Sequence, residues 1–281
     1  MKVILIADAG SSKTDWSLIS EQKVVNRYES VGINPAHSDP EDIVSSFLQV
    51  KEAISSRKID EVYFYGAGCA TRELKDKVSD SLGKTFDPGE IYVESDLTAA
   101  GIALFGKETG CACILGTGSS TGIYADGKIT RKIPSLGFLL GDEGSGTALG
   151  KRLLNAIYKE RLPKTFKGAL EKEYQINLAS LINKVYSLSK PGPYLASFSP
   201  FLLKNIENPE IKELVKEEFN SFIEKNLLPY DDINSFPIGM VGSIASYYSE
   251  IIKECAHGYG LGIKEVIQKP MPFLEKFYCE K

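Results

Sequence analysis

The feature that most constrains the fold of this chain is a repeated phrase, in which an apolar strand runs into a Gly-Ser-Ser turn. The first copy is VILIADAGSSKTDWSLI at residues 3–19, and the second is CACILGTGSSTGIY at residues 111–124. Glycine lets the backbone approach a ligand closely, and consecutive N–H groups with hydroxyl side chains supply donors to phosphate oxygens. The repeat therefore predicts two lobes, each with a turn suited to a phosphorylated ligand.

Neither turn has the spacing of the commonest nucleotide motifs. The chain contains no G-x-x-x-x-G-K-[ST] pattern, and no G-x-G-x-x-G follows a predicted strand. One Gly-Ser-Ser turn alone indicates little, because such turns also serve as ordinary connections between strands. The prediction depends on the recurrence of the turn after matching apolar strands.

Length and composition narrow the class of protein. The 281 residues exceed the usual domain size of about 100 to 200 residues, so two separate cores are expected. Hydrophobic residues make up 43% and charged residues 25%, as in an ordinary soluble globular protein. The net charge of −4, without a dense basic run, argues against a nucleic-acid partner and against a polybasic membrane patch.

Other features predict a cytoplasmic location. The apolar run at residues 3–7 is shorter than the core of a signal peptide, and no stretch approaches a membrane span. Five scattered cysteines make a disulfide framework unexpected, which fits a reducing compartment. Cys111 and Cys113 alternate in an apolar strand, so we interpret them as small buried residues on one face. Neither histidine has a second Cys or His at metal-site spacing.

Hydrophobic periodicity divides the chain into two halves that begin alike. Each half opens with three short strands, and Asp126-Gly127 favours a tight hairpin in the second. The boundary is predicted near residue 106, giving domains 1–106 and 107–281, with a helical insertion at about 147–228 in the second. A terminal helix from about residue 272 can pack back on the first domain. The expected strands are 3–8, 16–20, 24–28, 61–65, 91–93, 111–115, 121–124, 128–132 and 264–268, and the better defined helices are 40–54, 72–82, 97–105, 147–162 and 246–255.

Six short motifs occur in the order typical of one known family. They are DAGSSKTDW (8–16), GINPAH (32–37), ESDLTAAG (94–101), ILGTGSS (114–120), GFLLGDEGSG (137–146) and GMVGSIA (239–245). With the repeated three-strand opening, they make the chain resemble the sugar kinase, heat-shock protein and actin superfamily. Within it, the chain is most similar to the N-acetylglucosamine kinase branch of the BadF/BadG/BcrA/BcrD ATPase family, over essentially its whole length.

The resemblance implies an α/β fold with two ribonuclease-H-like, actin-like ATPase domains around a central cleft, which holds MgATP and a sugar. It implies an ATP-dependent amino-sugar kinase that phosphorylates the 6-hydroxyl of N-acetylglucosamine, a small-molecule partner. A homodimer is a further expectation from the resemblance.

The motifs and the chemistry of their residues assign roles to particular positions. Asp96 is the expected general base, and Asp8 is expected to organise Mg²⁺ through water. The expected ATP-binding residues are Gly10, Ser11, Ser12, Lys13, Thr14, Thr117, Gly118, Ser119, Gly242 and Ser243, and the expected sugar-binding residues are Asn34, Leu136, Gly137, Asp142 and Glu143. Ser11 and Ser12 stand where relatives often carry a third glycine and Thr. Leu136 replaces a tryptophan of some relatives.

Each candidate also has a purely structural interpretation. Asp96 can cap a helix, and Asp8 and Asn34 can stabilise turns. Lys13 can lie in solvent, and the acidic pair 142–143 can cap a helix or a loop. Trp16, the sole tryptophan, is predicted to pack in the core.

Three other functions stay open at the level of sequence. One is an ATP-driven reductase activator of the 2-hydroxyacyl-CoA dehydratase type, which would need cysteines placed for an iron-sulfur cluster. Another is a kinase for glucosamine, N-acetylmannosamine or a muramic-acid-type sugar. The third is a sugar-responsive regulator without catalysis, which retention of Asp96 and of both turns disfavours.

Overall fold

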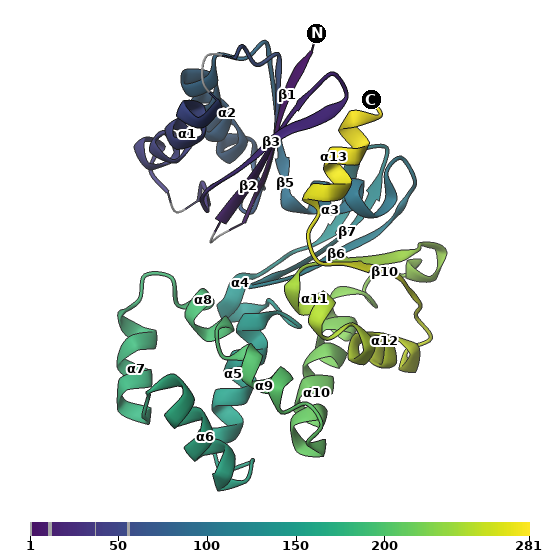
Figure 1. Ribbon diagram of the computed structural model, residues 1–281. Coiled ribbons are helices and arrows are strands. Elements are labelled where there is room, and N and C mark those ends of the chain that lie inside the picture. Colours follow the sequence, from purple (N-terminus) through teal and green to yellow (C-terminus); the bar gives the residue numbers. More distant parts are fainter. Residues whose placement is uncertain (1, 11–12, 37, 55–56) are drawn as a thin grey trace. The chain divides into compact units, whose positions relative to one another are not determined.

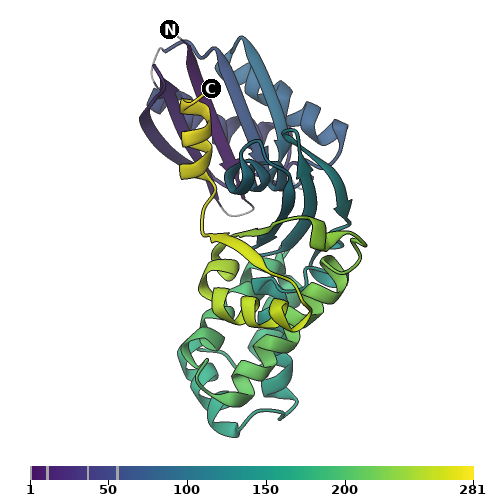
Figure 2. The ribbon, with the colours of Figure 1, turned by 90° about the vertical axis from the view of Figure 1, so that its right-hand side faces the viewer.

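The computed structural model describes residues 2–10, 13–36, 38–54 and 57–281. The chain forms two compact units. Figure 1 labels most of their elements, and Figure 2 shows the ribbon from a second direction. The first unit comprises Met1–Gly110, Ile123–Thr130 and Lys269–Lys281, and the second comprises Cys111–Gly122 and Arg131–Gln268. Neither unit is therefore one continuous stretch of sequence.

The first unit is built on a mixed sheet with the order β3-β2-β1-β4-β5. Strands β1 to β3 pair antiparallel as a meander, while β4 pairs parallel with both β1 and β5. Helices α1 and α2 cover one face of the sheet, and α3 and α13 lie on the other (Figure 1). The elements are β1 Val3–Ala9, β2 Lys13–Ser20, β3 Lys23–Val31, α1 Pro40–Ile54, β4 Glu61–Gly66, α2 Arg72–Phe86, β5 Glu90–Ser95, α3 Asp96–Phe105 and α13 Met271–Cys279.

The core under α1 and α2 is aromatic. Trp16 is 1% exposed, and its ring lies 5.4 Å from that of Phe47 and 6.1 Å from that of Phe64. The indole N–H donates to Ser30 Oγ at 3.0 Å, so the one polar atom of this ring is satisfied inside the core. The prediction that Trp16 packs in the core is confirmed.

The second sheet has the order β10-β9-β6-β7-β8. Strand β9 pairs parallel with both β6 and β10. Between β8 and β9 the regular elements are helices. The elements are β6 Gly110–Leu115, β7 Ser119–Ala125, β8 Lys128–Ile133, α4 Gly137–Leu140, α5 Gly146–Tyr158, α6 Lys164–Tyr174, α7 Leu178–Ser187, α8 Pro191–Ala196, α9 Ser199–Lys204, α10 Pro209–Asn226, η1 Ile233–Ser235, β9 Ile238–Val241, α11 Ser243–Tyr247, α12 Ser249–Gly258 and β10 Ile263–Ile267.

The predicted α/β class is confirmed, but some predicted helix limits were wrong. The expected helix 147–162 ends at Tyr158, and the expected helix 246–255 is two helices that begin earlier, at Ser243. The two helices, α11 and α12, are separated at Tyr248, a buried residue whose hydroxyl donates to the Ser199 carbonyl at 2.9 Å. Anchoring this side chain in the core takes precedence over continuous helix geometry. Within the described ranges, no helix combines the length and apolarity that a membrane span requires.

Candidate functional site

Two of the predicted acidic residues lie at the same edge of the first sheet. Strands β1, β4 and β5 are parallel, with Asp8 opposite Tyr65 and Gly66 opposite Ser95. Asp96 directly follows Ser95, so its backbone lies one residue beyond the end of β5. In open parallel sheets, ligands bind outside the carboxyl ends of the strands. This edge is therefore a candidate ligand site of the first unit.

The half-buried carboxyl of Asp8 lies in a strongly negative environment. Burial and the charges of Asp96 and Asp15 raise the pKa of Asp8 to about 7, and the positive charge of Lys269 opposes this rise. Asp15 faces Asp8 across the antiparallel pair, and Lys269 Nζ lies 3.9 Å from Asp15 Oδ2. Carboxylate oxygens suit a hard divalent cation, but no three His, Cys, Asp or Glu side chains among the described residues are grouped so as to hold a metal ion. The role of Asp8 toward Mg²⁺ therefore stays a prediction.

Asp96 occupies the first position of α3. Its Oδ1 accepts a hydrogen bond from the Leu97 N–H at 2.9 Å, and the helix N-terminus favours a negative charge there. Ser95 is the N-cap residue but makes no side-chain cap bond. The capping interpretation of Asp96 is thus realised in part through one carboxylate oxygen, while its role as general base stays a prediction.

The first glycine turn is described at its two ends. The Gly10 N–H donates to the Lys13 carbonyl at 2.9 Å. Lys13 Nζ forms ion pairs with Asp15, at 2.8 Å, and with Glu29. Thr14 is fully buried, and its hydroxyl donates to the Val31 carbonyl at 3.3 Å. Phosphate contacts by Gly10, Lys13 and Thr14 stay predictions, and the predicted Ser11 and Ser12 lie outside the described residues.

Asn34 is held beside the end of β4. Its Oδ1 accepts from the Ala36 N–H at 3.1 Å, and a Cβ on Gly68 would lie 2.3 Å from the same oxygen. Gly68 also has φ +87°, which favours glycine. Lys77 of α2 donates to the carbonyls of Ser38 at 2.5 Å and Pro35 at 3.1 Å. The loop that carries Asn34 is thus fixed at the edge where Asp8 and Asp96 lie.

In the second unit, the start of α5 pins the second glycine turn. The Gly146 N–H donates to the Gly116 carbonyl at 2.8 Å, and Thr147 Oγ1 donates to the Thr117 carbonyl at 2.6 Å. Within the turn, the Gly116 N–H donates to the Gly118 carbonyl at 3.0 Å. The backbone of the turn is therefore preorganised by residues distant in sequence.

Asp142 lies against this turn. Its Oδ1 accepts from the Ser119 N–H at 3.3 Å, and a Cβ on Gly118 would lie 3.1 Å from Asp142 Oδ2. Burial raises the pKa of Asp142. The structure therefore brings together a predicted phosphate turn and a predicted sugar-binding carboxylate, 23 residues apart.

The neighbouring carboxylate has a different environment. Glu143 accepts hydrogen bonds from Lys225 Nζ and Asn226 Nδ2 of α10, both at 3.3 Å. Burial alone would raise the pKa of Glu143, but its hydrogen bonds and the Lys225 charge outweigh burial and lower the pKa. The Glu143 carboxylate therefore already has two partners on α10, and sugar binding by Glu143 stays a prediction.

Gly242 brings the turn after β9 onto the end of β6. It has φ +124°, and a Cβ there would lie 2.2 Å from the Leu115 carbonyl oxygen. Its N–H donates to the Ile267 carbonyl at 3.0 Å. Ser243 follows as the first residue of α11 and is exposed. The predicted adenosine turn, 242–243, therefore adjoins the glycine turn that starts at Gly116.

The segment before Asp142 is apolar and exposed. Leu136 is 60% exposed and Leu139 77% exposed. Gly137, with φ +71°, begins the short helix α4. A Cβ on Gly141 would lie 3.1 Å from Leu136 Cβ, so this segment folds back close to Asp142.

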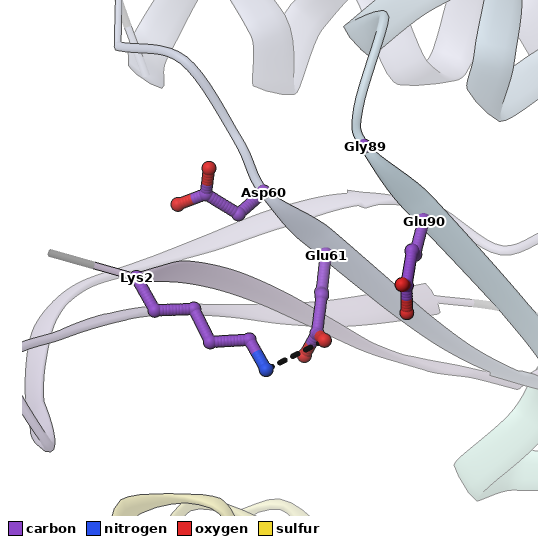
Figure 3. Close-up of a pocket in the computed structure, with 5 residues that line it drawn as sticks. All are labelled: Lys2, Asp60, Glu61, Gly89 and Glu90. Atoms are coloured by element: carbon purple, nitrogen blue, oxygen red, sulfur yellow. Dashed lines mark ion pairs between the residues drawn. The ribbon is translucent and has the colours of Figure 1, made fainter.

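A large surface hollow lies at the opposite edge of the first sheet (Figure 3). It has a volume of about 580 Å³ and is lined by Lys2, Asp60, Glu61, Gly89 and Glu90. Lys2 points to Glu61, and Lys2 Nζ lies 2.6 Å from Glu61 Oε1. None of the predicted site residues lines this hollow. This hollow therefore does not coincide with the candidate ligand site at the carboxyl ends of the strands.

Sequence reasoning missed several residues that support the candidate site. Lys77 and Lys269 are single lysines without a surrounding motif, and Gly68 belongs to an ordinary glycine turn. Only Gly68 gave a usable signal, because it follows an apolar strand whose carboxyl end would meet that of residues 3–8.

Solved structures resemble the chain over its whole length. A putative N-acetylglucosamine kinase from Porphyromonas gingivalis is 35% identical, with 99% of each chain covered and a TM-score of 0.94. A putative N-acetylglucosamine kinase from Chromobacterium violaceum is 15% identical, with 100% of this chain and 99% of that one covered and a TM-score of 0.80.

More distant structures share the fold alone. A ROK family glucokinase from Streptomyces griseus, in complex with glucose and AMPPNP, is 14% identical, with 99% of this chain and 97% of that one covered and a TM-score of 0.61. No protein-family model matches the sequence, and no curated protein matches it.

Proposed function

The chain belongs to the N-acetylglucosamine kinase-like branch of the BadF/BadG/BcrA/BcrD ATPase family, and on that premise we propose that it transfers the γ-phosphoryl group of ATP to the 6-hydroxyl of N-acetylglucosamine. As a member of this family, the chain is a phosphotransferase with an alcohol group as acceptor. The observation that carries the finer proposal is the convergence of Asp8, Asp96 and the Asn34 loop at one edge of the first sheet.

In this proposal Asp96 accepts the proton of the attacking hydroxyl. Phosphoryl transfer depends mainly on positioning and charge stabilisation, with a carboxylate to orient the acceptor and receive its proton. Asp96 Oδ1 accepts a hydrogen bond from the Leu97 N–H, which fixes the direction of the carboxylate. A carboxylate in a defined orientation can align the acceptor hydroxyl.

The proposal assigns the nucleotide to the two glycine turns and the 242–243 turn. The second turn supports this, because hydrogen bonds from residues distant in the sequence fix its backbone. Gly242 lies close to the Leu115 carbonyl, and Gly118 lies close to the Asp142 carboxylate, so both positions leave little room for a side chain. Asp8 would hold Mg²⁺ through water. When bound, Mg²⁺ neutralises phosphate charge and bridges phosphate oxygens. If Asp8→Ala left the Mg²⁺ dependence of turnover unchanged, this role of Asp8 would be abandoned.

The proposal assigns the sugar to Asn34 and Asp142, with Leu136 and Gly137 nearby in sequence. An amide both donates to and accepts from a hydroxyl, and a carboxylate accepts from one or two hydroxyls. The raised pKa of Asp142 reflects its desolvation. A desolvated carboxylate gains from hydroxyl donors that replace lost water, provided that it is ionised.

The reductase-activator alternative finds little support in the cysteines. Cys111 and Cys113 are both fully buried within β6. The hydrogen bond with Cys111 and burial raise the pKa of the Cys113 thiol well above its ordinary value. A protonated, buried thiol is a poor cluster ligand, because metals bind the thiolate.

The test is an ADP-release assay over N-acetylglucosamine, glucosamine, N-acetylmannosamine, N-acetylmuramic acid and glucose, followed by mass and fragment analysis of the product. We expect the highest kcat/KM with N-acetylglucosamine, and a product that carries phosphate at the 6-position. Equal ADP release with and without every sugar would overturn the kinase proposal. A preference for another sugar would overturn only the substrate assignment.

A further inference from the structure

Helix α10 carries one row of residues that contact the loop around Asp142. The Gly144 N–H donates to Glu218 Oε1 at 2.9 Å. A Cβ on Gly144 would lie 2.8 Å from Phe222 Cβ. Lys225 and Asn226 bind the carboxylate of Glu143. Positions 218, 222, 225 and 226 share one face of a helix, so the loop lies along this face.

Glu218 is the most deeply buried charged residue of this row. Its side chain is 7% exposed, and its Oε2 accepts from Arg152 Nε at 2.7 Å. Arg152 also donates from Nη1 to Glu217, at 2.7 Å, whose side chain is 48% exposed. A buried carboxylate is costly unless it is paired and hydrogen bonded. Glu218 meets both conditions, and one of its two oxygens is used on the loop.

Asp142 itself has few other constraints within the loop. It has φ +57°, its carbonyl accepts from the Ser145 N–H at 3.1 Å, and its side chain accepts from the Ser119 N–H. Gly144 lies only two residues away. A shift of the Gly144 backbone would therefore alter the direction of the Asp142 carboxylate.

We propose that Glu218 is a positioning residue for sugar binding, which acts through the Gly144 N–H to aim Asp142. The proposal rests on the proposed function, in which Asp142 accepts sugar hydroxyls. Glu143 is then the second tether of the loop, held by Lys225 and Asn226. Asp142 is left as the carboxylate of the pair that meets the substrate.

The experiment compares four variants in steady-state assays with N-acetylglucosamine and ATP. Glu218→Ala leaves the Gly144 N–H without its acceptor, and we expect the sugar KM to rise roughly tenfold or more, as loss of a buried hydrogen bond predicts. We expect the ATP KM to change by less than about threefold, since the bonds that fix the glycine turn come from Gly146 and Thr147, which belong to helix α5 and not to the loop. Glu218→Gln keeps an oxygen for Gly144 and should restore most of the sugar KM.

Glu217→Ala is the matched control, because it removes the exposed partner of Arg152 and leaves Gly144 untouched. We expect its sugar KM to match that of the parent protein. Equal changes in sugar and ATP KM in Glu218→Ala, or no rescue by Glu218→Gln, would overturn the positioning role. An unchanged sugar KM beside a lowered thermal midpoint would also overturn it.

Asp142→Ala separates this proposal from the proposed function. If Asp142→Ala leaves the sugar KM unchanged, the sugar-binding role of Asp142 fails, and the positioning role of Glu218 fails with it. If Asp142→Ala raises the sugar KM while Glu218→Ala does not, only the positioning role fails.

Discussion

The two glycine turns share a sequence phrase but differ in what surrounds them. Beside the first turn the chain gathers carboxylates, with Asp15 and Asp96 near Asp8. The second turn is fixed by backbone bonds from the start of α5 and by Asp142. A repeated motif thus sets the local backbone, whereas side chains from elsewhere determine the charge. In the proposed function, the first region holds the cation and the proton acceptor, and the second holds phosphate oxygens.

The largest effect should come from the carboxylate that distinguishes the first region. We expect Asp96→Asn to lower kcat by about 10²- to 10⁴-fold, the usual range for general base catalysis, with the fold retained. Asp126→Asn, at the β7-β8 turn, is the control and should leave kcat unchanged, because Asn also tolerates φ +50°. Near-normal turnover of Asp96→Asn would show that Asp96 is not the general base, and the first region would then differ less from the second.

The second region should be more sensitive to glycine replacement. Gly242→Ala introduces a side chain at φ +124° and 2.2 Å from a backbone oxygen, so we expect a loss of about 3 kcal/mol in the free energy of unfolding. Gly260→Ala, at φ +72° with nothing within 4 Å, should lose only about 1 kcal/mol. Denaturant unfolding of both variants measures the difference, and equal losses would show that the contact with Leu115 is not important.

The glycine of the first region should affect substrate binding more than stability. A Cβ at Gly68 meets the end of the Asn34 side chain, which can move, rather than a backbone atom. We expect Gly68→Ala to raise the sugar KM by roughly tenfold through displacement of Asn34. Steady-state kinetics test this, and a change confined to the ATP KM would contradict the assignment of Asn34 to the sugar.

The smallest expected effect is on acid stability and concerns α13. Burial would raise the pKa of Glu275, but hydrogen bonds from Arg27 and Ser17 outweigh it and lower the pKa. Such a group stabilises the fold above its unfolded pKa of 4.5, and this contribution is lost as pH falls through the lower folded pKa. Urea unfolding from pH 6 to pH 3 should show a shallower acid loss in Glu275→Gln than in the parent protein. The same slope in both would exclude Glu275 as a contributor.

The sequence predicted the features that depend on residues close together in the chain. Apolar runs and glycine turns located most of the strands, and the motifs placed Asp8 and Asp96 at the ends of two strands that both pair parallel with β4. Helix limits were less predictable where one buried side chain decides, as at Tyr248.

The supporting contacts could not be predicted, because they join residues far apart in the sequence. Lys77 reaches Ser38 across 39 residues, and Glu218 reaches Gly144 across 74. A lysine or glutamate on an amphipathic helix looks the same whether it faces water or anchors a distant loop. Such contacts become visible only when the packing of the helices is known.

Helix α13 belongs to the first unit although it follows the second unit in the sequence. Its Glu275 binds Arg27 Nε at 2.6 Å and Ser17 Oγ at 2.8 Å. During synthesis, the first strands leave the ribosome long before their last partner exists. The amino-terminal unit can therefore join Ser17 and Arg27 to Glu275 only after the residues of α13 have been synthesised.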